Sequence, residues 1–120
     1  MATILIVDDD PDVRSLYSKV LVCEGYQVVL ADDCAGAESS LKNQRIDLIV
    51  LDIQLKHESG LDLLQRIHKG RPHLPVILCS AYNYYKNDLS SWKADAYIVK
   101  SSDLSELKAD TERLLNRSYL

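Results

Sequence analysis

The sequence predicts an α/β domain built around a five-stranded parallel sheet, and two observations carry this prediction. Five short apolar runs recur along the 120 residues, each followed by a helix-sized segment. The third run is apolar without interruption from Leu48 to Leu51 and stops at Asp52. A continuous apolar run, rather than an alternating one, is typical of a strand covered on both faces. Strand-then-helix repeats with short connections indicate right-handed crossovers, and therefore a doubly wound sheet with helices on both faces.

The strands and helices follow from local patterns in chain order. The predicted strands are residues 3–7, 26–30, 46–51, 76–79 and 96–99. The predicted helices are residues 11–24, 35–41, a segment that opens at Gly60, a short irregular segment at 82–92, and residues 104–115. Residues 54–59 are expected to form a loop. For the sheet we expect the strand order 2-1-3-4-5, which is the flavodoxin-like arrangement.

Local signals mark the ends of the helices. Asp10 precedes Pro11, a pattern typical of an N-cap and a first helical position, and Gly25 provides a C-terminal stop. The last helix is expected to be capped near Asp103. The third helix is expected to present one face made of Leu61, Leu64, Ile67 and His68.

Length, composition and charge narrow the class of protein. We expect residues 1–120 to form one domain, and 47% hydrophobic and 27% charged residues are ordinary for a soluble protein. No apolar stretch reaches membrane-spanning length and no basic leader precedes the first strand, so we expect a cytoplasmic protein. A net charge of −4 without a Lys/Arg cluster argues against binding to nucleic acid or an anionic membrane.

Three cysteines, Cys23, Cys34 and Cys79, are scattered along the chain and form no C-x-x-C pair. We expect them to be buried or half-buried free thiols in a reducing compartment. No metal or redox role is assigned to them.

Acidic residues follow two strands that the predicted order makes neighbours. Asp8 and Asp9 follow the first strand and Asp52 follows the third, so their carboxylates should converge at the carboxyl edge of the sheet. Carboxylates this close repel one another and cannot all stay ionised without a cation. An oxygen-lined pocket suits Mg²⁺, which binds one or two carboxylates and bridges to a phosphate oxygen. Taken alone, Asp52 is equally compatible with capping the next turn.

Two further polar residues end the fourth and fifth strands. Ser80 and Lys100 should face the same crevice as Asp52. A carboxylate beside Mg²⁺ can act as a nucleophile and form an aspartyl phosphate. A hydroxyl can then hydrogen-bond a phosphoryl oxygen, and an ammonium can neutralise its charge. Either residue alone would be typical of a turn or a solvated strand end, but their joint arrival at successive strand ends favours a site.

Four ordered motifs carry a resemblance that spans the whole chain: I-L-I-V-D-D-D-P-D, D-L-I-V-L-D-I-Q-L-x-x-x-S-G-L-D-L-L, P-V-I-L-C-S-A and A-D-A-Y-I-V-K. They resemble the receiver domain of two-component response regulators, the CheY-like family. The resemblance implies phosphoryl transfer to Asp52 from a phosphohistidine on a histidine kinase or a histidine phosphotransfer protein. It implies a switch that assists its own phosphorylation and dephosphorylation rather than an enzyme.

The resemblance also implies roles for the other site residues. Asp9 would bind Mg²⁺ directly, Asp8 would act mostly through a bound water, and the backbone carbonyl of Gln54 would be a further ligand. Ser80 and Lys100 would contact the phosphoryl group. When Ser80 turns toward that group, the aromatic ring of Tyr97 would turn inward and remodel the face made by the fourth helix, the fifth strand and the last helix.

That face implies a downstream protein target or a fused output domain as partner. The sequence leaves open whether the receiver stands alone or belongs to a longer regulator or hybrid kinase. We expect no binding of nucleic acid or membrane by this domain. The last helix lacks the charge pattern of receivers that dimerise on DNA, so we expect a monomer, or at most a weak phosphorylation-dependent dimer.

Several positions depart from the family pattern. Lys100 is followed by Ser101 rather than proline, so we expect a trans peptide bond, because a cis bond without proline costs about 2.5–4 kcal/mol. In the loop after Asp52, His57 and Glu58 are expected to be solvated rather than extra metal ligands. Gln54 and Tyr82 would flank the path of water to the phosphoryl group, and we hypothesise that bulky Tyr82 prolongs the phosphorylated state.

Two alternative functions remain open at this stage. A haloacid-dehalogenase-type phosphatase would also use an Asp nucleophile and Mg²⁺, and Asp8 with Asp10 mimics its D-x-D motif. Asp12 does not fit that pattern, and the chain leaves no room for a substrate cap. The second alternative is a pseudo-receiver, in which the same fold binds partners independently of phosphorylation.

Overall fold

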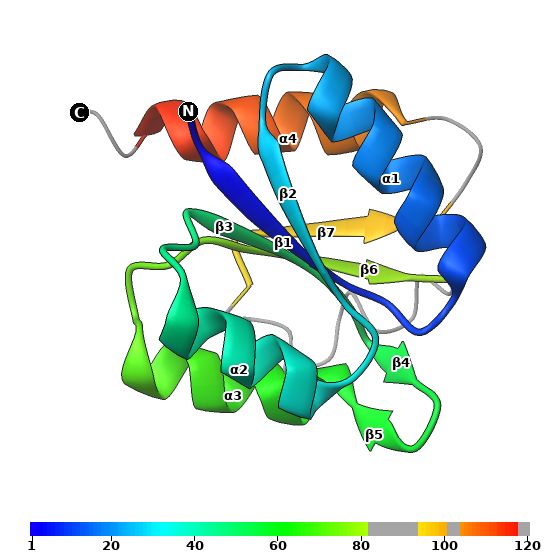
Figure 1. Ribbon diagram of the computed structural model, residues 1–120, viewed down its shortest axis with the longest axis vertical. Helices are drawn as coiled ribbons and strands as arrows, with labels where there is room; N and C mark the ends of the chain where they lie inside the picture. Colours follow the sequence, from blue (N-terminus) through cyan, green and yellow to red (C-terminus); the bar gives the residue numbers. More distant parts are fainter. Residues whose placement is uncertain (82–93, 101–103, 118–120) are drawn as a thin grey trace.

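The computed structural model describes residues 1–81, 94–100 and 104–117. Its centre is a parallel sheet with the strand order β2-β1-β3-β6-β7. The strands are β1 (Thr3–Val7), β2 (Gln27–Ala31), β3 (Leu48–Asp52), β6 (Val76–Ser80) and β7 (Ala96–Val99). In chain order these five strands have the arrangement 2-1-3-4-5, so the predicted α/β fold class and strand order are confirmed (Figure 1).

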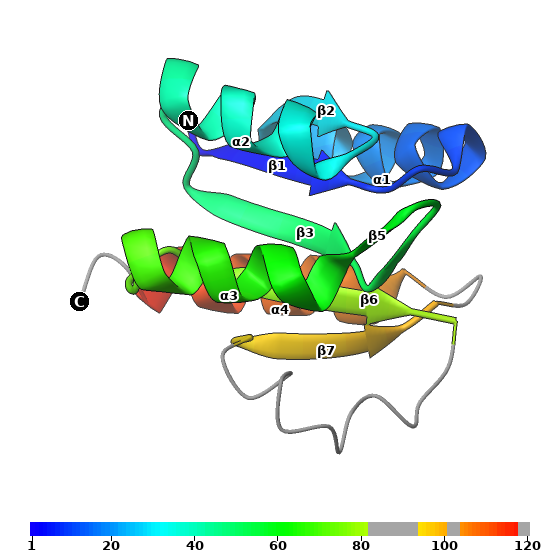
Figure 2. The ribbon, with the colours of Figure 1, turned by 90° about the horizontal axis from the view of Figure 1, so that it is seen from below.

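Helices cover both faces of the sheet, as expected. Figures 1 and 2 show α1 (Pro11–Cys23) and α4 (Ser105–Arg117) on one face and α2 (Cys34–Asn43) and α3 (Gly60–Gly70) on the other. The strand residues alternate between two buried clusters, one under each helix layer. Leu5, Leu51 and Leu78 pack toward α2 and α3, whereas Ile4, Val50 and Ile77 pack toward α1 and α4.

Local chemistry explains where the helices begin. The Asp10 side chain accepts the N–H of Asp12, and Pro11 occupies the first helical position of α1, as predicted. Asp33 accepts the N–H of Gly36 and caps α2, which therefore begins at Cys34, one residue earlier than expected. The Ser59 hydroxyl accepts the N–H of Leu61 at the start of α3.

The segment after Asp52 differs from the prediction. Instead of an open loop over residues 54–59, it forms a small antiparallel hairpin of β4 (Gln54–Leu55) and β5 (Glu58–Ser59). The hairpin is closed at its base because the N–H of Gly60 donates to the carbonyl of Ile53 at 2.7 Å. This hairpin leads directly into α3.

The face predicted for α3 is confirmed in part. Leu64 and Ile67 are buried and Leu61 is half-buried against the same cluster, but Leu63, which the prediction did not include, is also fully buried, and His68 is only half-buried. The burial predicted for the thiol of Cys23 was wrong. Cys23 lies exposed at the end of α1, whereas Cys34 and Cys79 are buried as expected.

Some predictions lie outside the described residues. These are the helix at 82–92, the cap at Asp103, the Lys100–Ser101 peptide bond and the role of Tyr82. Within the described part of the chain, no helix has the length and apolar character needed to cross a membrane.

Candidate functional site

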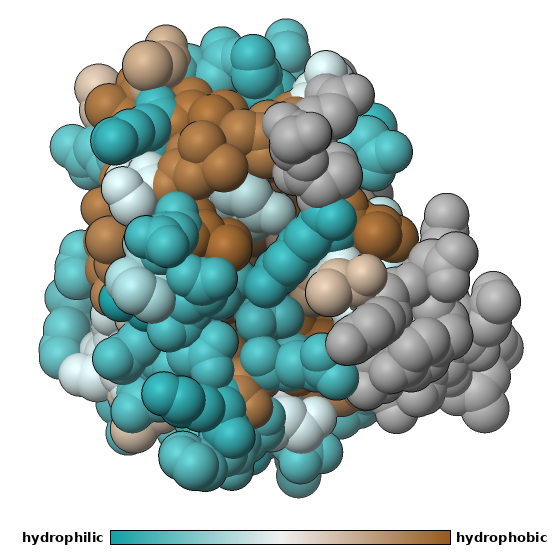
Figure 3. Space-filling view, turned by 90° about the vertical axis from the view of Figure 1, so that its right-hand side faces the viewer, coloured by the Kyte–Doolittle hydropathy of each residue, from teal (hydrophilic) through white to brown (hydrophobic). Residues whose placement is uncertain are grey.

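Three acidic residues meet at the carboxyl edge of the sheet. β1 and β3 run in parallel with Val7 opposite Leu51, so Asp8 follows one strand beside Asp52 at the end of the other. Carboxylate oxygens of Asp8, Asp9 and Asp52 all lie within 4.8 Å of one another. Figure 3 looks onto this edge, where hydrophilic residues cover the centre of the face and hydrophobic ones gather above it. The structure therefore brings together the three acids that the strand-end argument selected.

Lys100 contacts two of these acids. Its Nζ lies 2.8 Å from Oδ2 of Asp8 and 3.1 Å from Oδ2 of Asp52. Its backbone N–H donates to the carbonyl of Ser80 at 2.7 Å, which holds the end of β7 against the end of β6. The Asp8 and Asp52 side chains are only 3% and 5% exposed, so these contacts lie in a largely dehydrated environment. One ammonium leaves most of the negative charge of three carboxylates uncompensated.

The electrostatic surroundings of Asp52 oppose its ionisation. Burial, followed by the negative charge of Asp8, raises the pKa of the Asp52 carboxyl to about 6. Lys100 and the N–H of Gln54, which donates to Asp52 Oδ1 at 3.1 Å, act in the opposite direction. Burial tends to lower the pKa of Lys100, but its contacts with Asp8 and Asp52 outweigh this and raise it. Lys100 therefore remains an ammonium at neutral pH.

Backbone contacts fix the orientation of Asp8. Its Oδ1 accepts the N–H of Asp10 at 2.9 Å, which leaves Oδ2 directed to Lys100. The guanidinium of Arg14, one turn into α1, donates to the Asp8 carbonyl oxygen at 2.7 Å. The sequence does not single out Arg14, because a polar residue on a helix surface carries no signal for this contact.

Ser80 and Tyr97 lie on the same face of the sheet. Ser80 ends β6 and is buried, and strand alternation places it on the same side as Leu78. Leu78 pairs with Tyr97 of β7, which is half-buried against the cluster beneath α2 and α3. The two residues assigned to the switch are thus on neighbouring strands and on one face.

Gln54 begins β4 and is exposed. Its N–H is held by Asp52, and it pairs with Ser59 across the hairpin. The predicted metal ligand at this position is the backbone carbonyl, so the geometry of the hairpin decides where that oxygen lies.

Two buried residues beneath the acids, Tyr17 and Cys79, were not predicted to adjoin the site. Burial raises the pKa of Tyr17 well above its usual value, with further contributions from Cys79, to which it hydrogen-bonds, and from Asp8. Burial likewise raises the pKa of the Cys79 thiol to about 12. Tyr17 fits the helical spacing of α1, so the sequence indicated only a core residue.

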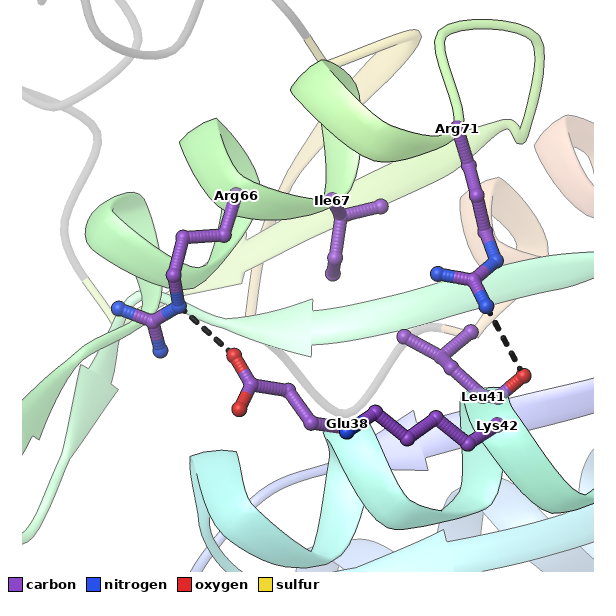
Figure 4. A pocket seen from close by; sticks show the side chains of 6 residues that line it. All are labelled: Glu38, Leu41, Lys42, Arg66, Ile67 and Arg71. Carbon is purple, nitrogen blue, oxygen red and sulfur yellow. Dashed lines mark hydrogen bonds and ion pairs between the residues drawn. The ribbon is translucent and has the colours of Figure 1, made fainter.

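The donor set fits a hard divalent cation. The acidic cluster offers only oxygen ligands, two of its three members are buried, and their mutual repulsion is incompletely offset by Lys100. Mg²⁺ prefers such carboxylate oxygens and retains several waters. A separate groove between α2 and α3 contains arginines and a glutamate and offers no comparable acidic cluster (Figure 4).

A family model described as the response regulator receiver domain matches residues 4–112. The chain belongs to this family. This family assignment excludes the phosphatase alternative. The strand order of the sheet and the similarity to a solved CheY-like receiver domain agree with the assignment.

Solved receiver structures are closely similar over nearly the whole chain. Response regulator TrrA from Thermotoga maritima, solved in complex with Mg²⁺-BeF, is 40% identical with a TM-score of 0.92, and the match covers 96% of this chain and 100% of that chain. TrrA in a complex with histidine kinase ThkA is 39% identical with a TM-score of 0.90, covering 96% and 99%.

Curated relatives include longer regulators. The probable transcriptional regulatory protein TcrX from Mycobacterium tuberculosis is 33% identical over 118 residues, which cover 97% of this chain and 50% of that protein. The nitrogen assimilation regulatory protein NtrX from Azorhizobium caulinodans is 37% identical over 116 residues, covering 93% and 26%. The receiver chain thus spans half or less of the length of these two relatives.

Proposed function

We propose that this receiver domain is a phosphoacceptor whose reactive residue is Asp52. The observation that carries the proposal is the position of its carboxylate, which is buried, contacts Lys100, and lies within 4.8 Å of the carboxylates of Asp8 and Asp9. The donor would be a phosphohistidine on a histidine kinase or a histidine phosphotransfer protein. The complex of TrrA with ThkA supports this class of partner.

The chain's own residues supply the parts of a phosphoryl transfer. A carboxylate oxygen of Asp52 attacks phosphorus, a new P–O bond forms, and the P–N bond breaks with its electron pair moving to the imidazole nitrogen. With a pKa of about 6, Asp52 is mostly ionised at neutral pH and can attack. Lys100, which remains positively charged, is placed to contact an incoming phosphoryl oxygen. Ser80 would donate its hydroxyl hydrogen to another of these oxygens.

Mg²⁺ is the cofactor that suits this site. Asp9 and Asp52 would bind it directly, Asp8 mostly through a water, and the carbonyl oxygen of Gln54 would complete the protein ligands. When bound, the ion supplies positive charge that offsets the clustered carboxylates and the phosphoryl oxygens. The Mg²⁺-BeF complex of TrrA supports this choice of metal.

The output would be a change of surface rather than turnover of a separate substrate. Ser80 and Tyr97 share a face on adjacent strands, so movement of the hydroxyl toward the phosphoryl group would free space for the aromatic ring. The altered face, which includes β7 and α4, would bind a downstream protein or a fused output domain. The greater length of TcrX and NtrX supports an output domain.

Incubation with acetyl phosphate, with and without Mg²⁺, tests the proposal. Intact-mass spectrometry should detect one added phosphoryl group that requires Mg²⁺ and is absent from Asp52→Asn. Asp62→Asn, which removes an exposed carboxylate from α3, is the matched control and should be phosphorylated normally. Absence of incorporation into the wild type would refute the phosphoacceptor and favour the pseudo-receiver.

A further inference from the structure

The carboxylate of Glu58 holds the hairpin after Asp52 against the start of α2. Glu58 lies on β5, and its Oε2 accepts the backbone N–H of Cys34 at 2.9 Å. Cys34 is the first residue of α2, and its N–H is one of those that a helix cannot satisfy internally. A carboxylate at this end of a helix is also favoured by the helix dipole. Glu58 is exposed to solvent and lies outside the acidic cluster, as expected, but its hydrogen bond to the Cys34 amide was not predicted.

The hairpin transmits this contact to the acidic pocket. Glu58 pairs with Leu55, and Ser59 pairs with Gln54, in a two-residue antiparallel ladder. The start of the hairpin is fixed separately, because the Gln54 N–H donates to Asp52. Glu58 therefore holds the far end of the hairpin that contains the Gln54 carbonyl.

α2 is itself a firm anchor for this contact. The Arg66 Nε of α3 donates to Glu38 Oε1 of α2 at 2.7 Å, and Arg71 donates to the Leu41 carbonyl at 3.1 Å (Figure 4). The same two helices share a buried cluster that includes Cys34. The Glu58 side chain thus connects the hairpin to a helix that is already tied to α3.

We propose that Glu58 is a positioning residue for the metal site: its hydrogen bond to the Cys34 amide fixes the β4–β5 hairpin and thereby the backbone carbonyl of Gln54, the metal ligand proposed above. This inference rests on the proposed function. It also makes the beginning of α2 sensitive to the state of the pocket, because coupling between two sites acts in both directions.

Mg²⁺ titration by calorimetry on the 120-residue chain tests the inference. Glu58→Ala should weaken Mg²⁺ binding by about tenfold, which is the usual effect of losing a residue that orients a ligand. Glu58→Gln retains an acceptor of the same reach and should bind Mg²⁺ as the wild type does. Glu58→Asp retains the charge but is one methylene shorter, so it should resemble Glu58→Ala. Asp62→Ala removes an exposed carboxylate from α3 and leaves the acceptor of the Cys34 amide in place, so its affinity should not change.

An amide spectrum provides a readout that is independent of phosphorylation. In ¹H–¹⁵N correlation spectra, Mg²⁺ should shift the Cys34 amide resonance in the wild type and in Glu58→Gln, but not in Glu58→Ala. Folding of each variant is checked in the same spectra.

The possible outcomes separate the two claims. Wild-type affinity in Glu58→Ala, or weakened binding in Glu58→Gln together with normal binding in Glu58→Asp, would overturn the positioning role while leaving the phosphoacceptor intact. The second pattern would mean that only the negative charge of Glu58 matters. A wild type that binds no Mg²⁺ and accepts no phosphoryl group would overturn both the proposed function and the inference that rests on it.

Discussion

At the scale of single residues, the contacts of Lys100 determine the charge balance of the site. Its ammonium lies within 3.1 Å of both Asp8 and Asp52, whereas the acids repel one another. In the part of the chain that the structure describes, Lys100 is thus the side-chain cation that offsets the repulsion between these acids when no metal is bound. This arrangement predicts that the stability of the fold depends on Lys100 and on Mg²⁺ in a linked way.

Lys100→Met should lower the free energy of unfolding by about 2 kcal/mol in chelator-treated buffer, because a largely buried ion pair loses one partner. The partial exposure of Lys100 keeps this loss below that of a fully buried pair. Added Mg²⁺ should restore part of that loss. Urea denaturation with and without Mg²⁺ measures both effects. Lys108→Met, whose 4.0 Å contact with Glu24 lies at the surface, should change little. Equal stability of Lys100→Met and the wild type without metal would contradict this account.

Thr111 lies on the buried face of α4, and its Oγ1 has no hydrogen-bond partner among the described residues. Replacing Thr111 with valine keeps the shape and removes a buried hydroxyl that costs about 1–3 kcal/mol when unpaired. Thr111→Val should therefore raise the free energy of unfolding by about 1 kcal/mol, measured by urea denaturation. A loss of stability would show that the hydroxyl has a favourable contact.

The sequence located Asp8, Asp9, Asp52 and Lys100 because strand ends can be recognised from the apolar runs that precede them. The structure brings these four residues together. The contacts of Arg14, Tyr17 and Glu58 were not predictable, since each depends on how a helix or hairpin packs against a distant segment. No local pattern marks a residue for such a contact.

At the scale of elements, Gly60 allows the start of α3 to lie against the end of β3. A Cβ added at Gly60 would collide with the carbonyl oxygen of Asp52 and approach the backbone of Ile53. Backbone on both sides leaves little room to adjust. Gly60 is therefore required by a close approach, which also sets the base of the β4–β5 hairpin.

Gly60→Ala should lower the free energy of unfolding by about 2 kcal/mol or more, because the overlap must be relieved by moving the backbone next to Asp52. It should also weaken Mg²⁺ binding. Gly70→Ala is the matched control at the other end of α3, where an added Cβ meets no atom within 4 Å. That change should be neutral or stabilise by up to about 1 kcal/mol. Thermal denaturation of both variants distinguishes the steric effect from a general intolerance of α3.

The elements themselves were largely predictable, with boundary shifts of one or two residues. The exception is the hairpin after Asp52. Its strands contain two residues each, and its turn, Lys56 and His57, lacks the glycine or asparagine that marks a hairpin in sequence.

At the scale of the whole molecule, the two hydrophobic clusters leave the three cysteines in different environments. Cys23 is exposed, while Cys34 and Cys79 lie inside opposite clusters. Burial raises the pKa of Cys34 to about 11 and that of Cys79 to about 12. Both thiols therefore stay protonated and shielded while the fold is intact.

A maleimide reagent at pH 7.5 should label one cysteine in the native protein, Cys23, and all three in urea. Peptide mapping by mass spectrometry identifies the labelled positions, and rapid native labelling of Cys34 or Cys79 would contradict the packing described.

The same thiols give a pH dependence of stability. Because the folded-state pKa values of Cys34 and Cys79 exceed those of an unfolded chain, their contribution is complete below about pH 8.5 and is lost as the pH rises toward the folded values. The free energy of unfolding should therefore fall above about pH 9, and Cys79→Ser should weaken that dependence in urea titrations at several pH values.

The fold as a whole was predictable because five apolar runs and their short connections admit few parallel topologies. Reduction of the acetyl phosphate-treated protein with borohydride, followed by peptide mapping, tests whether Asp52 is the phosphoacceptor. An acyl phosphate on an aspartate is reduced to homoserine, so the account predicts homoserine in place of Asp52, with Asp8 and Asp9 unchanged. Homoserine at Asp8 or Asp9, or at no position in a protein that has gained a phosphoryl group, would contradict the assignment of Asp52 as the phosphoacceptor.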